Sequence, residues 1–318
     1  SSDLRGGIAI TASHNPAEWN AYKFFDHHGS FLNRAQNKTL LEIAQNAAFR
    51  RASYDQLGRV EPRTDAITRH IDRVLATVDT SAVAGRGYRA VVDCVNGVGG
   101  LIMRPLLERL GVEAEFLHTD VDRPFPRNPE PLPENLKELA ARVRDARADI
   151  GIAVDPDVDR LAIVDETGRP IGEERTIVLA AGAALEASPG PMVVNLSTTR
   201  AMNDLAERHG VPLHRTPIGE AHVVGRIREV DALIGGEGNG GVIYPAVHCG
   251  RDSATGVALI MAAMAAKGAR VSELNAAVPD YAMVKTKFPL SGTDFAEAAR
   301  RVRAAFPDAK GWNTEDGV

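Results

Sequence analysis

The sequence contains few cysteines, no long apolar run and no concentration of charge of one sign. Among 318 residues there are two cysteines, Cys94 and Cys249. They are too few for a disulfide framework and are typical of a reducing compartment, so we expect a cytoplasmic protein. No apolar stretch approaches the length of a membrane span. The net charge is -5 and no basic run is present, which argues against nucleic-acid and membrane partners. Local sites must therefore recognise small or anionic ligands.

Strand-like and helix-like runs alternate along the chain, which predicts an α/β protein rather than an all-α or all-β one. A strand, a glycine-bearing turn and a helix recur in this order, first in "YRAVVDCVNGVGGLIMRPLLERLG" and again in "PMVVNLSTTRAMNDLAERHG". This repetition indicates successive related α/β domains rather than one sheet. Near the beginning of the chain we expect a buried strand in "GGIAIT", a hairpin in "YKFFDHHGSFL" and an amphipathic helix in "NRAQNKTLLEIAQNAAF".

The segment "ITASHNPAEWNAYKFF", residues 10–25, contains a serine followed directly by a histidine. A hydrolase nucleophile normally lies on a G-x-S-x-G turn, with a histidine supplied from elsewhere in the chain. Ser13 instead has Ala12 and His14 beside it. Adjacent side chains in an extended loop point apart, so we expect His14 to be poorly placed to deprotonate Ser13. An acyl-transfer role for this serine is therefore disfavoured.

The segment "DPDVDR" carries aspartates at alternate positions, followed by Arg160. In a tight loop, Asp155, Asp157 and Asp159 can direct their oxygens at one hard cation such as Mg²⁺. The spacing also imitates an EF-hand calcium loop, but Arg160 stands at the position where that loop needs glycine. A solvated acidic turn is the plain alternative. It is disfavoured because three carboxylates this close repel one another unless a cation joins them.

Two glycine-rich segments allow more than one interpretation. In "VNGVGG" we interpret Gly97, Gly99 and Gly100 as turn and helix-packing residues, with dinucleotide binding a minor alternative, since the spacing is not G-x-G-x-x-G. In "GGEGNGG" a carboxylate and an amide, Glu237 and Asn239, lie among glycines, as suits either sugar hydroxyls or a structural hairpin. Lys23 and Arg251 are equally ambiguous when taken alone.

Together and in this order, these segments resemble the α-D-phosphohexomutases, the phosphoglucomutase/phosphomannomutase superfamily. "TASHNP" is similar to the family's phosphoserine loop, "DPDVDR" to its magnesium loop, usually D-G-D-G-D-R, and "GEGNG" to its sugar-binding G-E-x-S/N-G loop. The resemblance covers nearly the whole chain. It implies an isomerase in which a phosphoserine donates its phosphoryl group to a sugar phosphate, and a bound hexose 1,6-bisphosphate then returns its other phosphate to the serine.

The resemblance also implies residue roles. Ser13 would carry the phosphoryl group, and Mg²⁺ would be held by a phosphate oxygen on Ser13 together with Asp155, Asp157 and Asp159. Lys23 would be the general acid/base, Arg160 would pair with the phosphate, and His14 with Asn15 would order the loop. The candidates for substrate binding are Glu237, Asn239, Gly219 and Arg251. The implied partner is a small sugar phosphate, and we expect a monomer or homodimer.

The sequence departs from the family pattern at a few positions. Pro156 and Val158 replace the usual glycines of the metal loop, which keeps the ligands but stiffens the turn. Asn239 and Gly241 stand where many relatives carry serine and histidine, and Glu220 lies in a segment, "RTPIGEAHV", that corresponds to a specificity loop. "NPAEWNAYKF" and "GGEGNGG" look more like the phosphoglucosamine mutases, so that substrate is predicted first, with the phosphomannomutase/phosphoglucomutase activity as the alternative.

The resemblance further predicts mixed-sheet domains around a central cleft and an incomplete C-terminal domain of α+β type. Because the chain begins without Met and stops at "WNTEDGV", we expect sequence upstream and an unfinished fourth domain. The expected segments are the C-terminal part of domain 1 with the phosphoserine loop, domain 2 with the metal loop, domain 3 with the sugar loop, and the start of a truncated or disordered domain 4, at 1–82, 83–187, 188–288 and 289–318.

Two alternatives of other classes stay open on the residues alone. A noncatalytic sugar-phosphate-binding protein could share the fold, although Ser13, Lys23 and the three aspartates are all retained. An aspartate-nucleophile phosphatase could use "DPD" as its D-x-D motif, but the small hydroxyl residue expected after that motif is missing. A phosphatase would also leave the serine loop unexplained.

Overall fold

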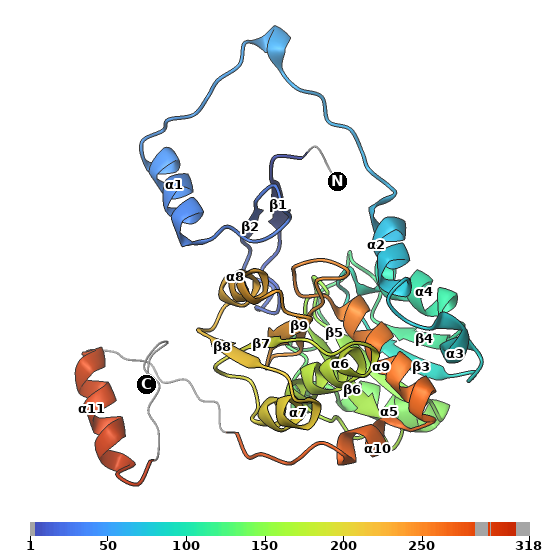
Figure 1. Ribbon diagram of the computed structural model, residues 1–318. Helices are drawn as coiled ribbons and strands as arrows, with labels where there is room; N and C mark the ends of the chain where they lie inside the picture. Colours follow the sequence, from blue (N-terminus) through green and yellow to red (C-terminus); the bar gives the residue numbers. More distant parts are fainter. Residues whose placement is uncertain (1–3, 284–291, 293, 310–318) are drawn as a thin grey trace.

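Two four-stranded mixed sheets with the same strand arrangement form the body of the protein (Figure 1). The computed structural model describes residues 4–283, 292 and 294–309. In each sheet a central strand is flanked by two parallel partners, and the strand at one edge runs antiparallel. The expected repetition of α/β units is therefore confirmed as one topology built twice.

The first sheet has the order β4-β3-β5-β6. Crossover helices join its parallel strands, as parallel pairing requires. In chain order its elements are β3 (Arg89–Asp93), α4 (Gly99–Arg109), β4 (Glu113–Leu117), the short helix η2 (Pro133–Asn135), α5 (Lys137–Ala146), β5 (Ile150–Val154), β6 (Leu161–Asp165) and α6 (Glu173–Ala187).

The second sheet has the order β10-β9-β7-β8. Its strands and longer helices follow one another in the same order as those of the first unit. The elements are β7 (Met192–Asn195), α7 (Ala201–His209), β8 (Leu213–Thr216), α8 (Glu220–Val230), β9 (Ile234–Glu237), β10 (Gly241–Ile243), α9 (Ser253–Lys267) and α10 (Val271–Ala276).

One apolar core is shared by the two units because α6 and α9 pack against each other between the sheets. Helix α9 is alanine-rich, and 12 of its 15 residues are buried. Small side chains allow its neighbours to approach closely on every side. Since burial of apolar surface is the main favourable term in folding, this core fixes how the loops of one unit face those of the other.

The N-terminal segment lies outside this two-sheet body (Figure 1). Its elements are β1 (Gly7–Ile10), β2 (Tyr22–Phe25), α1 (Arg34–Gln45) and η1 (Tyr54–Gln56). The helix predicted in "NRAQNKTLLEIAQNAAF" is confirmed and begins after Asn33, which forms a capping box with Gln36. The hairpin is also confirmed, since β2 is extended by a bridge from Phe25 to Phe31.

The prediction of a buried strand in "GGIAIT" is wrong. Strand β1 forms, but Ile8 and Ile10 are 64% and 67% exposed. The reason is that β1 and β2 pair only with each other in the described chain, and neither side of this ribbon is covered by a packed layer. The ribbon is held instead by its loops, among them the loop of Ser30, whose hydroxyl accepts a hydrogen bond from Arg228 of α8 at 2.6 Å.

The remaining helices connect or follow these units: α2 (Ala66–Leu75), α3 (Thr80–Ala84) and α11 (Phe295–Ala305). Helix α11 has no buried residue. The expected fourth-domain segment, 289–318, lies partly outside the described residues, and its described part contains α11. Within the described chain, no helix combines the length and the apolar character that crossing a membrane requires.

The turn after β3 touches the acidic loop that follows β5. A Cβ atom on Gly97 would lie 2.5 Å from the Cα and the carbonyl oxygen of Pro156, and the Val98 N–H donates to that same oxygen at 3.0 Å. A Cβ on Gly99 would lie 2.6 Å from Val154. The interpretation of these glycines as turn and packing residues is confirmed, and Gly97 sets the position of the acidic loop.

Gly97→Ala is expected to destabilise the protein by about 1–3 kcal/mol, because the added methyl group would overlap backbone atoms of Pro156 that cannot move independently. Chemical denaturation monitored by circular dichroism measures the effect. The matched control is Gly225→Ala in α8, where nothing lies within 4 Å of the added Cβ; it should be neutral or stabilise by up to about 1 kcal/mol. Equal effects of the two substitutions would contradict the packing account of Gly97.

Candidate active site

Ser13 is held in a tight turn that directs its hydroxyl at the acidic loop. Its φ of 52° lies in the left-handed region, which is unusual for a residue other than glycine. The Ser13 N–H donates to Thr11 Oγ1 at 2.9 Å, and Asn15 Nδ2 donates to the Ala12 carbonyl at 2.8 Å. Ser13 Oγ donates to Asp155 Oδ2 at 3.0 Å. The structure therefore brings together a serine and an aspartate that are 142 positions apart.

The expectation that His14 points away from Ser13 is wrong in its geometry. His14 Nδ1 lies 3.3 Å from Ser13 Oγ, because the left-handed turn at Ser13 folds the two side chains toward each other. Burial, and then the positive charge of Arg160, lower the pKa of His14 below its usual value, so the ring is neutral near pH 7. On the far side of the ring, Nε2 lies 3.9 Å from Glu130.

The acidic loop is the turn between β5 and β6, and its backbone is fixed by Asp155. Asp155 Oδ1 accepts hydrogen bonds from the N–H groups of Asp159 and Arg160, both at 3.0 Å. Val158 has a φ of 65°, which lies in the left-handed region. A β-branched residue is strained there, and the Val158 carbonyl is held by the Ser253 N–H at 3.1 Å. The loop is thus shaped by the second unit as well as by the first.

The three aspartates converge as predicted. Asp155, Asp157 and Asp159 each offer an oxygen within 4.8 Å of the others. Burial, and then the negative charges of Asp159 and Asp157, raise the pKa of Asp155 well above its usual value. Burial and the neighbouring carboxylates therefore both disfavour the charged form of Asp155.

Two cations from other parts of the chain compensate part of this charge. Lys23 Nζ lies 2.6 Å from Asp157 Oδ2 and 3.1 Å from Asp159 Oδ2, and Arg251 Nη2 lies 2.5 Å from the same Asp159 oxygen. Burial alone would lower the pKa of Lys23, but the charges of Asp159 and Asp157 outweigh it and hold that pKa above its usual value. Burial alone would raise the pKa of Asp159, but Arg251 and Lys23 hold it below the usual value.

The acidic loop fits a divalent cation. Asp157 Oδ1 and Asp159 Oδ1 are buried and have no hydrogen-bond partner, which is costly for a carboxylate unless a cation supplies the missing interaction. Carboxylate oxygens are the ligands that Mg²⁺ prefers. Asp155, Asp157 and Asp159 could hold the ion, with Ser13 adjacent to it.

The glycine-rich loop after β9 is linked to the acidic loop through Arg251. Glu237 is buried and accepts from Arg251 Nη1 at 2.8 Å and from Asn195 Nδ2 at 2.8 Å. The Gly219 N–H donates to the same carboxylate at 3.2 Å. Glu237 is thus engaged on both oxygens, while Asn239 Oδ1 accepts from the Gly241 N–H at 3.2 Å.

Several residues of this site were not predicted as site residues. Glu130 accepts from Arg160 Nη1 at 2.9 Å, and Thr11 Oγ1 donates to Asp157 at 3.1 Å. Glu220, named without a role, lies 3.0 Å from Arg251 Nε, and burial raises the pKa of this carboxyl to about 7. Asn195 could have been found because it ends a central parallel strand, at the sheet edge where α/β proteins bind ligands.

A cavity of about 310 Å³ opens beside Ser13. It is lined by Trp19 and Asn20 of the N-terminal segment and by Arg123 and Phe125 of the segment that follows β4. A second, mainly apolar cavity of about 350 Å³ lies among α6, α7, α9 and α10 and contains none of the candidate residues. The cavity beside Ser13 combines an aromatic ring, an amide and a cation, as a small polar ligand requires.

Comparison with protein families gives three consecutive matches. The α/β/α domains I, II and III of phosphoglucomutase/phosphomannomutase match residues 1–51, 68–168 and 172–281. A phosphoglucomutase/phosphomannomutase of Thermococcus kodakarensis is 37% identical over 317 residues, which are 98% of this chain and 69% of that protein. A Methanopyrus kandleri protein named "Probable phosphoglucosamine mutase" is 35% identical over 321 residues, which are 99% of this chain and 70% of that protein.

Solved structures agree with the fold. A phosphoglucomutase/phosphomannomutase family protein from Burkholderia thailandensis has a TM-score of 0.81 at 27% identity, and the likeness covers 98% of this chain and 66% of that one. N-acetylphosphoglucosamine mutase of Aspergillus fumigatus, solved with GlcNAc-6P and magnesium, shares the fold at a TM-score of 0.60 and 20% identity, over 86% of this chain and 73% of that one. With consecutive matches to domains I–III and relatives 37% and 35% identical along nearly its whole length, the chain belongs to the phosphoglucomutase/phosphomannomutase family of phosphohexomutases, which are isomerases.

Proposed function

We propose that the protein interconverts hexose 1-phosphate and hexose 6-phosphate through a phosphoserine at Ser13 and a hexose 1,6-bisphosphate intermediate. The observation that carries the proposal is the contact of Ser13 Oγ with Asp155 at 3.0 Å, inside a cluster of three carboxylates whose charge Lys23 and Arg251 compensate only in part. A phosphoryl donor needs such a place, because its transfer depends on charge neutralisation and alignment.

In the proposed step the bond between phosphorus and Ser13 Oγ breaks, and a new bond forms between phosphorus and the free hydroxyl oxygen of the sugar phosphate. The hydroxyl proton passes to a base, and Ser13 leaves as the alkoxide or takes a proton. The reverse transfer uses the other phosphate of the bisphosphate, so the serine regains its phosphoryl group. The sum is an isomerisation in which no atom is gained or lost by the enzyme.

We propose for individual residues the roles that the family resemblance implies, and their contacts are compatible with these roles. Lys23 is the proposed general acid/base; it bonds Asp157 and Asp159 and lies beside the acidic loop that Ser13 faces. Arg160 is the proposed phosphate partner, and His14, 3.3 Å from Ser13 Oγ, is proposed to orient the serine. Mg²⁺, held by the three aspartates and the Ser13 phosphate, would supply the positive charge that stabilises the transferring group.

The sugar is proposed to lie between the acidic loop and the glycine-rich loop. Asn239 and Gly219 would contact its hydroxyl groups. Glu237 is engaged by Arg251, so a sugar hydroxyl would have to share this pair or displace it. Glucosamine phosphate is the first candidate substrate, and mannose and glucose phosphates are the alternatives.

Further properties are proposed on the same basis. Hexose 1,6-bisphosphate would act as activator, because it can phosphorylate an unmodified Ser13. The protein is proposed to be a cytoplasmic monomer or homodimer, and both cysteines are unpaired. The domain boundaries predicted at residues 82, 187 and 288 remain proposals; the family matches end at 51, 168 and 281.

The choice of sugar is tested by comparing kcat/KM of the full-length protein for glucosamine, mannose and glucose 1-phosphates. We expect the glucosamine substrate to be preferred by about tenfold, since one well-formed polar contact to a substituent is worth about 1–2 kcal/mol. A preference for mannose or glucose 1-phosphate would reject the first candidate substrate and leave the mutase proposal intact.

Ser13→Ala is expected to abolish phosphoenzyme formation and turnover, because the proposed mechanism transfers the phosphoryl group through Ser13 Oγ. Mass spectrometry after incubation with hexose 1,6-bisphosphate measures the added phosphate, and a coupled assay measures turnover. Thr11→Ser is the matched control, since it keeps the hydroxyl that bonds Asp157 and should be phosphorylated on Ser13. Substantial turnover by Ser13→Ala, or a phosphate found on an aspartate, would refute the mechanism.

The metal site predicts opposite effects for two substitutions. Asp157→Asn removes a ligand charge and should weaken Mg²⁺ binding by about tenfold or more, whereas Lys23→Gln removes a competing cation and should preserve or strengthen binding. Turnover should nevertheless fall by about 10²–10⁴-fold in Lys23→Gln if this residue transfers the proton. Isothermal titration and steady-state kinetics measure the two quantities. Metal-free protein that kept full activity would contradict the assignment of the acidic loop.

A further inference from the structure

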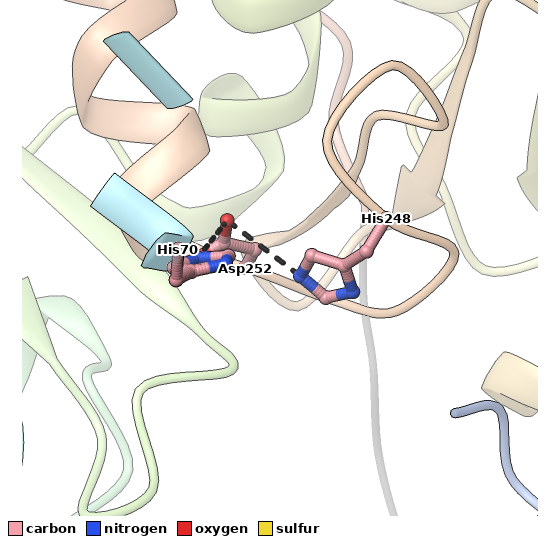
Figure 2. Close-up of side chains that lie close together, drawn as sticks. All are labelled: His70, His248 and Asp252. Atoms are coloured by element: carbon pink, nitrogen blue, oxygen red, sulfur yellow. Dashed lines mark hydrogen bonds and ion pairs between the residues drawn. The ribbon is translucent and has the colours of Figure 1, made fainter. Parts of the chain in front are cut away.

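A second cluster of possible metal ligands lies outside the candidate active site. It consists of His70 on α2, His248 in the loop after β10, and Asp252, the N-cap of α9 (Figure 2). His70 Nε2 lies 2.9 Å from Asp252 Oδ2, and His248 Nε2 lies 3.7 Å from the same oxygen. One nitrogen of each histidine and one carboxylate oxygen of Asp252 all lie within 4.8 Å of one another. None of the three residues is used by the proposed reaction.

The two histidines converge on Asp252 from different parts of the chain. His70 is 182 positions from Asp252 and belongs to the segment matched by domain II, whereas His248 and Asp252 belong to the segment matched by domain III. The two rings meet edge to face, with centroids 5.2 Å apart. Figure 2 shows an interaction from each imidazole to the Asp252 carboxylate.

Three hydrogen bonds hold Asp252 in place. Its Oδ1 accepts from the Ala254 N–H at 3.0 Å, and its Oδ2 accepts from the hydroxyl of Thr255. Its own N–H donates to the Val242 carbonyl at 2.8 Å. Hydrogen bonds of this kind to a carboxylate ligand orient it for a metal and are a regular part of metal sites.

The two histidine rings are the more exposed part of the cluster. The Asp252 side chain is 7% exposed, while His70 and His248 are 25% and 37% exposed. A cation can therefore enter from the side of the rings and meet the carboxylate at the bottom. A water molecule could complete the coordination on the more exposed side.

We propose that His70, His248 and Asp252 bind a zinc-type divalent cation that joins helix α2 to the loop before α9. Two imidazoles and one carboxylate are a ligand set typical of Zn²⁺. Ligands about 2.0–2.1 Å from a tetrahedral ion lie about 3.3–3.5 Å apart, and the observed separations of 2.9 and 3.7 Å bracket that value. Small side-chain rotations would complete the site. Mg²⁺ is disfavoured because it prefers an all-oxygen environment.

The site is independent of the proposed mutase reaction and has a structural consequence. Asp252 follows Arg251, which bonds Asp159, and it precedes Ser253, which holds the acidic loop at Val158. A cation on Asp252 would therefore strengthen the contact between the two units close to the active site.

The experiment titrates zinc into EDTA-treated full-length protein in the presence of excess Mg²⁺, which occupies the acidic loop. Calorimetry should detect one tightly bound zinc ion per chain. His70→Ala and His248→Ala should each lower the affinity for zinc by about 10- to 100-fold, because each removes one of three ligands. Cobalt substitution should give the intense visible absorption of a tetrahedral site. Zinc should also raise the melting temperature of the unsubstituted protein, and not that of the histidine variants.

Two controls separate this site from other zinc binders. His27→Ala tests the exposed pair His27 and His28, whose rings lie 3.7 Å apart, and should leave binding unchanged. Asp157→Asn should also leave zinc binding unchanged. The absence of a tight equivalent in the unsubstituted protein, or its loss in either control instead of in the histidine variants, would overturn the proposal. If one histidine variant failed to fold, the other variant and the cobalt spectrum would decide.

Discussion

The repulsion among three carboxylates in one buried six-residue turn is the constraint on which the rest of the structure depends. Asp155, Asp157 and Asp159 follow a fully buried strand, where solvent screens the repulsion between their charges only weakly. Lys23 from the N-terminal hairpin and Arg251 from the second unit form ion pairs with these carboxylates and reduce the repulsion. Three separate segments are therefore held together by one electrostatic requirement, and the hydroxyl of Ser13 is placed where they meet.

The scaffold makes this arrangement possible by repeating one topology. Both units end a mixed sheet in an antiparallel hairpin, and the two hairpins touch where the Leu161 N–H donates to the Gly240 carbonyl at 3.0 Å. A Cβ on Gly240 would lie 2.3 Å from the Leu161 carbonyl oxygen, so this contact needs glycine. The apolar core that α6 and α9 share between the two units stabilises this position of the two hairpins relative to each other.

Much of the fold could be predicted from the sequence because its signals are local. The strand, turn and helix pattern, the capping residue Asn33 and the alternate aspartates depend on neighbours along the chain. The contacts of the site could not be predicted in the same way. His14 contacts Ser13 only because Ser13 adopts a left-handed backbone conformation. The Glu237 carboxylate accepts a hydrogen bond from Arg251, and His70 contacts Asp252 although 182 positions separate them. The exposure of β1 was missed because an apolar strand does not reveal whether a layer covers it.

We propose that the acidic loop is a cation site in which Lys23 lies against the carboxylates that a divalent ion would bind. A crystal structure with Mn²⁺ in place of Mg²⁺ tests it most directly, because the anomalous signal locates the metal without reference to the protein. We expect one strong peak bounded by Asp155, Asp157 and Asp159, with the Lys23 ammonium displaced from at least one of its two carboxylates. A peak elsewhere, with Lys23 still bonded to both Asp157 and Asp159, would contradict it.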